Sequence, residues 1–358
     1  MSQELRIGGV PVVTLQDHDA ASGFVEASVL PGRGMMLLQA RVRHSALGEI
    51  DALTAPPLEE TARRLDGGAD DFAGSAAFSM GGAILLPYAN RITGTDVAGR
   101  REITAVVAGR RARLPRNWGG KAPGARQYAM HGLILDATAS DVTRPTPAEV
   151  VAHLAMGDFD GRWPGRADVR ICYRLVGGAL ELDVETTNIG AEPLPLGVGW
   201  HPYFNLPSGR RSEAQLRLPA RARAPANNYD EVLPTGRIEP VAGGPFDFRT
   251  ARALGDLYLD DCFTDLERDA AGNVVCEVTD PVAGYGLRIS SPSPLVKAVQ
   301  VYAPPGKAFV VLEPQFNLAD PYSPVWPEGL DTGMALLGPG EMAAYAVRLE
   351  TFVPQAAP

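Results

Sequence analysis

The sequence predicts an all-β protein, an antiparallel sandwich or barrel, and two observations carry that expectation. Several segments alternate apolar and polar residues with a period of two, which is typical of half-buried strands. The 358 residues also include 39 glycines and 31 prolines spread along the chain, which suits short strands joined by turns better than long helices. Hydrophobic residues make up 45% and charged residues 21%, as in an ordinary globular protein.

The clearest strands lie in the middle and at the end of the chain. Residues 168–175 and 180–185 both alternate strictly, and Gly177-Gly178 between them predicts a hairpin. Residues 345–351 alternate in the same way. Shorter candidate strands lie at 215–218, 273–278, 285–290, 296–302 and 308–312. The repeated spacing of strands and turns is what favours a sandwich or barrel.

Helical signals are few. Thr146, Pro147 and Glu149 form a capping-box pattern ahead of an apolar run, which predicts a short helix over 147–155. His153 is expected at the surface near the end of that helix. A second short helix is possible over 57–65. Because no repeat, linker or low-complexity tract interrupts the chain, we expect one domain over residues 1–358.

Charge and composition exclude several classes of function. A net charge of −9 provides no basic field for a nucleic acid or an anionic membrane. No run of about 18 apolar residues could span a bilayer, and the first residues show no apolar signal-peptide region. We therefore expect a cytoplasmic protein, either a monomer or a homodimer. Three cysteines are too few for a disulfide framework, and Cys172 and Cys276 are expected to be buried free thiols.

Two segments carry the residue types that acid–base chemistry needs. His201 lies in Gly-Trp-His-Pro-Tyr-Phe-Asn-Leu, residues 199–206, where Pro202 restrains its backbone and where it could equally be a bonded core histidine. Glu313 ends the apolar run Phe-Val-Val-Leu, so burial would raise its pKa, unless it is a solvent-exposed strand end. An imidazole and a carboxylate of this kind can serve as acid and base.

Other polar residues are weaker candidates for holding a ligand. Arg91, beside Asn90 at the end of an apolar run, offers a rigid fork of donors to neighbouring sugar hydroxyls, or is a surface arginine. His131 precedes a glycine that permits close backbone approach or an unusual turn, or else His131 is a core histidine bonded to a carbonyl. Asp260 and Asp261 could bind hydroxyls or belong to a turn. The basic stretch 100–126 is either a solvated loop or a phosphate contact. No nucleotide, nucleophile-elbow or zinc motif is present.

Taken together, these segments resemble the aldose 1-epimerase, or galactose mutarotase, family over most of the chain. Each short motif is weak, but eight of them occur in the family's order. They are Asn90-Arg91-Ile92, Met130-His131-Gly132, His201 to Leu206, Leu233 to Gly236, Pro245 to Arg249, Leu259 to Phe263, Val299 to Tyr302 and Leu312 to Gln315. The resemblance implies a large antiparallel β-sandwich with an open carbohydrate cleft on one face.

The resemblance also implies roles for individual residues. Glu313 matches the family's general base and His201 its general acid. The groups that match holders of sugar hydroxyls are Asn90, Arg91, His131, Asp260 and Gln300. Three departures suggest a divergent branch: proline follows His201, only one glycine follows His131, and Asp261 stands where relatives often have histidine. The last departure leaves open whether Asp260 or Asp261 contacts the sugar.

The implied chemistry is interconversion of the α and β anomers of a monosaccharide. Opening a pyranose requires a proton to leave the C1 hydroxyl and a proton to reach the ring oxygen. In our hypothesis ionised Glu313 takes the first proton and protonated His201 gives the second, so neither a cofactor nor a metal is expected. Two other functions stay open: a hexose-6-phosphate 1-epimerase that uses the basic stretch, and a sugar-binding or sensing protein without catalysis.

Overall fold

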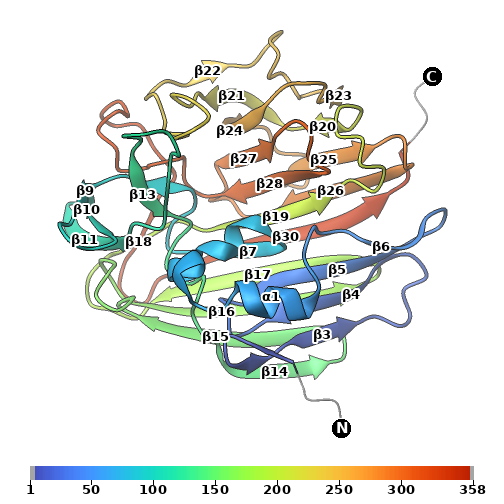
Figure 1. Cartoon of the computed structure of the whole chain (residues 1–358), viewed down its shortest axis with the longest axis horizontal. Coiled ribbons are helices and arrows are strands. Elements are labelled where there is room, and N and C mark those ends of the chain that lie inside the picture. Colours follow the sequence, from blue (N-terminus) through green and yellow to red (C-terminus); the bar gives the residue numbers. More distant parts are fainter. Residues whose placement is uncertain (1–4, 355–358) are drawn as a thin grey trace.

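Figure 1 shows a computed structural model of the chain, which describes residues 5–354. Within these residues, strands predominate and form a nine-stranded and an eleven-stranded sheet, whose strands pair antiparallel. Four smaller sheets and two short helices complete the described part of the chain. The all-β class and the sandwich architecture predicted from the alternating segments are confirmed.

The two large sheets have strands drawn from distant parts of the sequence. The nine-stranded sheet contains, in spatial order, β14 (Ser140–Thr146), β15 (Glu149–Gly157), β16 (Ala167–Val176), β17 (Ala179–Asn188), β30 (Met342–Phe352), β26 (Tyr285–Ser291), β25 (Val274–Asp280), β20 (Gln215–Arg217) and β23 (Arg252–Ala253). The eleven-stranded sheet contains β22 (Glu239–Pro240), β21 (Ala220–Ala224), β24 (Leu259–Leu266), β27 (Ala298–Ala303), β28 (Phe309–Gln315), β19 (Gly199–Asn205), β7 (Gly82–Leu85), β5 (Met36–His44), β4 (Gly23–Leu30) and β3 (Val13–Gln16), and β6 (Gly48–Asp51) pairs with β5.

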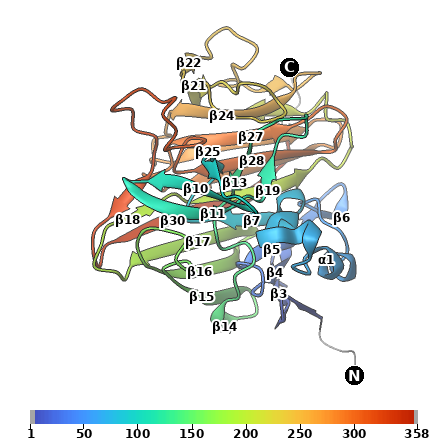
Figure 2. The ribbon, with the colours of Figure 1, turned by 60° about the vertical axis from the view of Figure 1, so that its left-hand side comes forward.

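The smaller elements lie around the two large sheets (Figures 1 and 2). The small sheets are β1 (Arg6–Ile7) with β2 (Val10–Pro11); β11 (Arg110–Pro115), β10 (Glu102–Val107) and β9 (Thr95–Asp96); β12 (Trp118–Gly119), β13 (Gln127–Met130) and β8 (Arg91–Ile92); and β18 (Leu194–Leu196) with β29 (Ala335–Leu337). The helices are α1 (Leu58–Arg64) and the 3₁₀ segment η1 (Ala69–Ser79). The helix predicted over 57–65 is confirmed as α1, whereas η1 was not predicted.

The core lies between the two large sheets. Trp200 and Phe204 of β19 and Leu312 of β28 belong to one hydrophobic cluster with residues of the nine-stranded sheet, such as Leu182. Because successive side chains of a strand point to opposite faces, the residues between these core positions point to the outer face of the eleven-stranded sheet. His201 and Glu313 are among them. The shared core favours the predicted single domain.

The strand predictions from alternation hold across the described chain. Residues 168–175 and 180–185 lie in β16 and β17, which pair through Val176 and Ala179 around the predicted Gly177-Gly178 turn. Both glycines have positive φ, 56° and 78°, which a two-residue turn matching the strand twist requires. Residues 345–351 lie in β30, and the shorter candidates fall in β20, β25, β26, β27 and β28.

The predicted helix over 147–155 is wrong, because that segment is strand β15. Val150, Ala152 and Leu154 are buried between less buried neighbours, a period of two that the capping-box pattern concealed. Thr146 pairs with Glu149, so Pro147-Ala148 forms the hairpin turn between β14 and β15. His153 therefore lies on a strand, with Nδ1 3.6 Å from a carboxylate oxygen of Asp168.

Two further expectations concern membranes and thiols. Neither helix in the described range 5–354 has the length and apolar character needed to cross a bilayer. The three cysteines are buried and free, as expected for Cys172 and Cys276.

Candidate active site

Three of the predicted site residues stand in a row across the eleven-stranded sheet. Gln300 on β27 pairs directly with Glu313 on β28. Strand β28 pairs with β19 in a register that places Gly199 opposite Gln315. His201, two residues further along β19, consequently lies opposite Glu313. Side chains opposite each other on one face of an antiparallel pair are close neighbours, so the register brings the predicted acid and base together.

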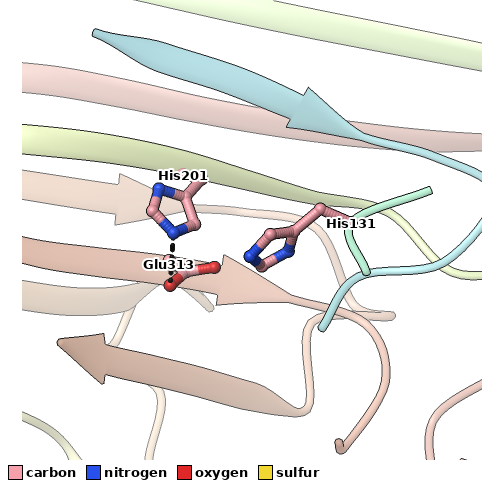
Figure 3. Close-up of side chains that lie close together, drawn as sticks. All are labelled: His131, His201 and Glu313. Carbon is pink, nitrogen blue, oxygen red and sulfur yellow. Dashed lines mark ion pairs between the residues drawn. The ribbon is translucent and has the colours of Figure 1, made fainter. Parts of the chain in front are cut away.

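The imidazole of His201 and the carboxyl of Glu313 are in contact. Nε2 of His201 lies 3.4 Å from Oε1 of Glu313 (Figure 3). The ring of His131 packs edge-on against that of His201, with centroids 4.8 Å apart. All three residues line a cleft of about 320 Å³, although His201 is only 5% exposed and Glu313 only 1%. The two reactive groups are therefore largely shielded from water but accessible to a ligand in the cleft.

Burial sets the protonation of this pair. It lowers the pKa of His201 to about 4 and raises the pKa of Glu313 well above that of a carboxyl in water, with the nearby Asp260 adding to the rise. Burial thus favours the uncharged form of both groups, the neutral imidazole and the protonated carboxyl. The protonated histidine and ionised glutamate of the hypothesis therefore require a proton to move against these pKa shifts. Burial likewise lowers the pKa of His131 well below its usual value.

A closed hydrogen-bond network holds the other predicted residues. Arg91 donates from Nη1 to Oδ1 of Asn90 at 2.7 Å and from Nε to the Tyr128 hydroxyl at 3.2 Å. Its Nη2 lies 3.5 Å from Asp260, to which Gln300 also donates at 2.6 Å. Asn90 closes the network by donating to Gln300 at 3.0 Å. Both polar atoms of Asn90 are thereby used and its side chain is fully buried, so Asn90 orients the lining residues from behind the cleft.

The backbone around Asn90 and His131 adopts unusual conformations. Both residues have φ of 63°, in the left-handed region that non-glycine residues rarely occupy. The amide of His131 donates to the carbonyl of Asn90 at 2.8 Å, which ties the two segments together. At Gly132 a Cβ atom would lie 2.2 Å from the carbonyl oxygen of Leu86, so only glycine fits. This close approach is what the glycine after His131 predicted.

Asp260 and Asp261 face different surroundings. Asp260 lines the cleft, where it contacts Arg91 and Gln300. Asp261 is 1% exposed and accepts hydrogen bonds from Arg223 at 2.7 Å and from the Tyr229 hydroxyl at 2.8 Å. Its oxygens are therefore occupied within the protein. Of the two, Asp260 is the one placed to contact a ligand.

The cleft also has walls that the sequence argument missed. Aromatic side chains line it: Phe78, Trp118, Tyr203, Tyr229, Tyr258 and Tyr302. Trp118 is 40% exposed, and an exposed tryptophan in a polar segment is the signal that could have identified it.

Asn317 is a second residue that the sequence argument missed. It is fully buried, and its side chain both donates to and accepts from the backbone of Ala89, which fixes the residue before Asn90. It follows Glu313 by four residues and had no distinguishing pattern.

The basic stretch 100–126 reaches the mouth of the cleft. A second cavity of about 290 Å³ is lined by Arg101, Arg116 and Lys121 together with Asn117, Trp118, Gly119 and Gln127. Trp118, Gly119 and Lys121 line both cavities, so the two adjoin. Arg116 forms an ion pair with Asp96 at 2.9 Å, and Arg101 stacks on Phe72. Part of the stretch therefore forms the strands β10 and β11 and faces solvent, and another part, which includes Trp118 and Lys121, lines the cleft.

Comparison of the amino-acid sequence with known proteins identifies a family and several relatives of this chain. The family model described as aldose 1-epimerase matches residues 52–349. The uncharacterized protein YphB of Escherichia coli K12 is 29% identical over 186 residues, which are 49% of this chain and 57% of YphB. The galactose mutarotase of Homo sapiens is 31% identical over 107 residues, 29% of this chain and 30% of that protein. These alignments span less than two thirds of the relatives' lengths.

Comparison of structures matches nearly the whole chain. A GalM/aldose epimerase homologue from C. elegans superimposes with a TM-score of 0.71 and 19% identity, covering 96% of this chain and 99% of that one. A galactose 1-epimerase from Lactobacillus acidophilus gives a TM-score of 0.68 and 17% identity, covering 99% and 98%. At such low identities the likeness shows the fold, which is the mutarotase-like sandwich that the motifs implied.

Proposed function

The chain belongs to the aldose 1-epimerase family, and on that basis we propose that it interconverts the α and β anomers of free aldoses by acid–base ring opening and reclosure. The observation that carries the proposal is the 3.4 Å contact between Nε2 of His201 and Oε1 of Glu313 in a cleft. That cleft, at about 320 Å³, has the volume of a small-ligand site.

We propose that the resting pair holds the single proton that the reaction needs, on Glu313, because burial favours the uncharged form of both groups. We propose that binding of a sugar moves this proton from Glu313 to His201 across their contact, which yields a carboxylate and an imidazolium without any net uptake of protons. Glu313 then accepts the proton of the C1 hydroxyl while His201 donates to the ring oxygen. The C1–ring oxygen bond breaks as the C1 carbonyl forms. Each correctly placed acid or base typically contributes about 10² to 10⁴-fold.

The second half of the reaction reverses these roles. The open-chain aldehyde rotates about the C1–C2 bond and exposes its other face to the hydroxyl that closes the ring. His201 recovers its proton from that hydroxyl as the ring closes, and Glu313 returns a proton to the oxygen on C1. Arg91, His131, Asp260 and Gln300 line the same cleft and would hold the remaining hydroxyls, so that only the C1 end moves. No electron or group is transferred to a partner molecule.

Polarimetry tests the proposal directly. Freshly dissolved α-glucose or α-galactose changes its optical rotation slowly until the anomers reach equilibrium. The protein is expected to shorten that relaxation in proportion to its concentration without altering the final rotation. A rate equal to the buffer-catalysed rate for both sugars and for their 6-phosphates would disprove the epimerase activity. Binding of a sugar in the same samples would then favour a sugar-binding or sensing protein.

A second candidate function is epimerisation of hexose 6-phosphates. The observation that favours it is the cavity lined by Arg101, Arg116 and Lys121, which adjoins the cleft through Trp118. Cationic groups in a cavity that adjoins the cleft could hold a phosphate. Comparing kcat/KM for glucose with kcat/KM for glucose 6-phosphate separates the two. Preference for the phosphorylated sugar, lost in R116Q, would assign the cavity to the phosphate.

The cellular context stays a prediction. A cytoplasmic location, a small-molecule sugar as partner, and a monomeric or homodimeric state are proposed from the composition and the family.

A further inference from the structure

The two imidazoles of the cleft and the carboxyl of Glu313 bring three potential metal-ligand atoms close together. His131, His201 and Glu313 each offer one donor atom, and these atoms all lie within 4.8 Å of one another. In Figure 3 the three side chains extend toward a common point from three separate segments of the chain. All three are buried, and all three line the cleft.

Several of their polar atoms have no partner within the protein. Across residues 5–354, no hydrogen bond reaches either nitrogen of His131, Nδ1 of His201 or Oε2 of Glu313. Leaving a buried polar atom unpaired costs about 1–3 kcal/mol. Such atoms at the wall of a cleft identify a place where a ligand supplies the missing bonds.

The spacing matches the coordination of one particular kind of metal ion. Two histidines and one glutamate are the ligand set of a catalytic zinc site, with a fourth position open to water or substrate. Zinc–ligand bonds of about 2.1 Å in a tetrahedron place neighbouring ligand atoms about 3.4 Å apart. Nε2 of His201 and Oε1 of Glu313 are already 3.4 Å apart. The donor atom of His131 lies within 4.8 Å of the other two, so it has to approach by at most about 1.4 Å to complete the set.

We propose that His131, His201 and Glu313 form a Zn²⁺ site, and that zinc bound there excludes the sugar and inhibits the enzyme. The ion takes up the nitrogen of His201 and the carboxylate of Glu313, which are the groups that the reaction needs. The cleft side provides the fourth ligand position. Zinc is therefore an inhibitor of this active site and no cofactor of it.

The surrounding charges permit a dication in this cleft. The carboxylate of Asp260 offsets the cationic Arg91, which lies 3.5 Å from it, and binding of zinc would displace the proton of Glu313. Two imidazoles favour zinc over magnesium or calcium, which prefer oxygen ligands.

Isothermal titration of ZnCl₂ into the chelator-treated full chain tests the site without any measurement of activity. Wild type is expected to bind one zinc ion per chain. H131N, H201N and E313Q should each raise Kd at least about tenfold, because each removes a ligand. H153N is the matched control: His153 lies on β15 beside Asp168, outside the cleft, and its loss should leave Kd unchanged. Circular dichroism checks that each variant is folded.

Substitution of Co²⁺ for zinc provides a second readout. Tetrahedral cobalt with nitrogen ligands gives strong visible absorption, and this absorption should disappear in H131N but persist in H153N. Saturating galactose should raise the apparent Kd for zinc, a competition that rests on the proposed function. Absence of saturable zinc binding, or equal affinity in the three ligand variants, would overturn the site. If zinc binds as described but polarimetry finds no epimerisation, the site stands and the proposed reaction falls.

Discussion

Oε1 of Glu313 lies 3.4 Å from Nε2 of His201, and the two side chains reach each other from neighbouring antiparallel strands, β28 and β19. Both groups are buried, and burial favours the uncharged form of each. In the proposed reaction the proton that one of them must carry passes between the two groups. The following predictions test that pair and its neighbours.

Replacing Glu313 with glutamine should abolish turnover. The amide keeps the shape of the side chain but can neither take the proton of the C1 hydroxyl nor share one with His201. We expect kcat to fall by about 10² to 10⁴-fold, measured by polarimetry after subtraction of the spontaneous rate. If E313Q retains more than about a tenth of the wild-type rate, Glu313 is not the base.

The pH dependence of kcat/KM should show an acid limb near pH 4. Because burial lowers the pKa of His201 to about 4, a second proton enters the pair only below that pH and then blocks proton acceptance. Loss of the single proton at higher pH removes the acid, so the profile is bell-shaped and its midpoints belong to the pair. An acid limb near pH 6.5, where a histidine in water titrates, would contradict the lowered pKa. Samples returned to neutral pH control for acid unfolding.

E313Q should be more stable than wild type at alkaline pH. The folded-state pKa of Glu313 is raised, so its contribution to stability is present below its unfolded pKa and lost as pH rises through its folded pKa. The difference in Tm between E313Q and wild type should therefore grow from acid to alkaline pH. About 1 kcal/mol corresponds to roughly 2–4 °C in a chain of a few hundred residues. A difference that shrinks with pH would refute the raised pKa.

Replacing Arg91 with lysine should weaken sugar turnover despite keeping the charge. The guanidinium donates separately to Asn90 and Tyr128 and lies beside Asp260, and a single ammonium cannot reach all three. We expect kcat/KM to fall at least about tenfold, since each hydrogen bond to a charged group contributes roughly 1.5–3 kcal/mol. R170K, at the partly exposed ion pair with Glu185 on the other large sheet, should stay within about twofold of wild type.

Comparing D260N with D261N should show which of the two aspartates contributes to sugar binding and which contributes mainly to stability. Asp260 lines the cleft, where its side chain is 13% exposed against 1% for Asp261, so D260N should raise KM and should lower Tm less than D261N does. Asp261 is paired with Arg223 and Tyr229 inside the protein, so D261N should lower the free energy of unfolding by about 1–3 kcal/mol. Thermal unfolding and sugar kinetics on both variants check this. The reverse pattern would mean that Asp261 is the residue that contacts the sugar.

Much of the fold could be predicted because alternation is a local signal. In β16 and β17 every second side chain enters the core, and the two glycines between them adopt the positive φ that a tight turn needs. The segment 147–155 was misread because Thr146, Pro147 and Glu149 serve a hairpin turn as well as they serve a helix start. Only the pairing of β15 with β14 and β16 decides between these structures, and pairing is not local.

The site was predictable in its residue types but not in its geometry. The motif order placed His201 and Glu313 in one site, but the register that sets them opposite each other is a property of the sheet. Nor could the sequence show that the side chain of Asn90 is hydrogen-bonded to Arg91 and Gln300 and lies behind the cleft. The protonation of the pair depends on burial, to which the packing of His131 against His201 contributes.

The pairing of β28 with β19 makes the distance between acid and base a consequence of interstrand spacing. Loops at the rim could lengthen, shorten or change composition and alter which sugar fits, while the separation of the two reacting groups stayed constant. A slip of β28 by one residue would be far more damaging, because it would turn Glu313 toward the interior and bring Leu312 or Pro314 outward. Backbone pairing of β28 with β19 therefore fixes the separation of the two reacting groups. Changes in the surrounding loops can alter the sugar specificity without altering that separation.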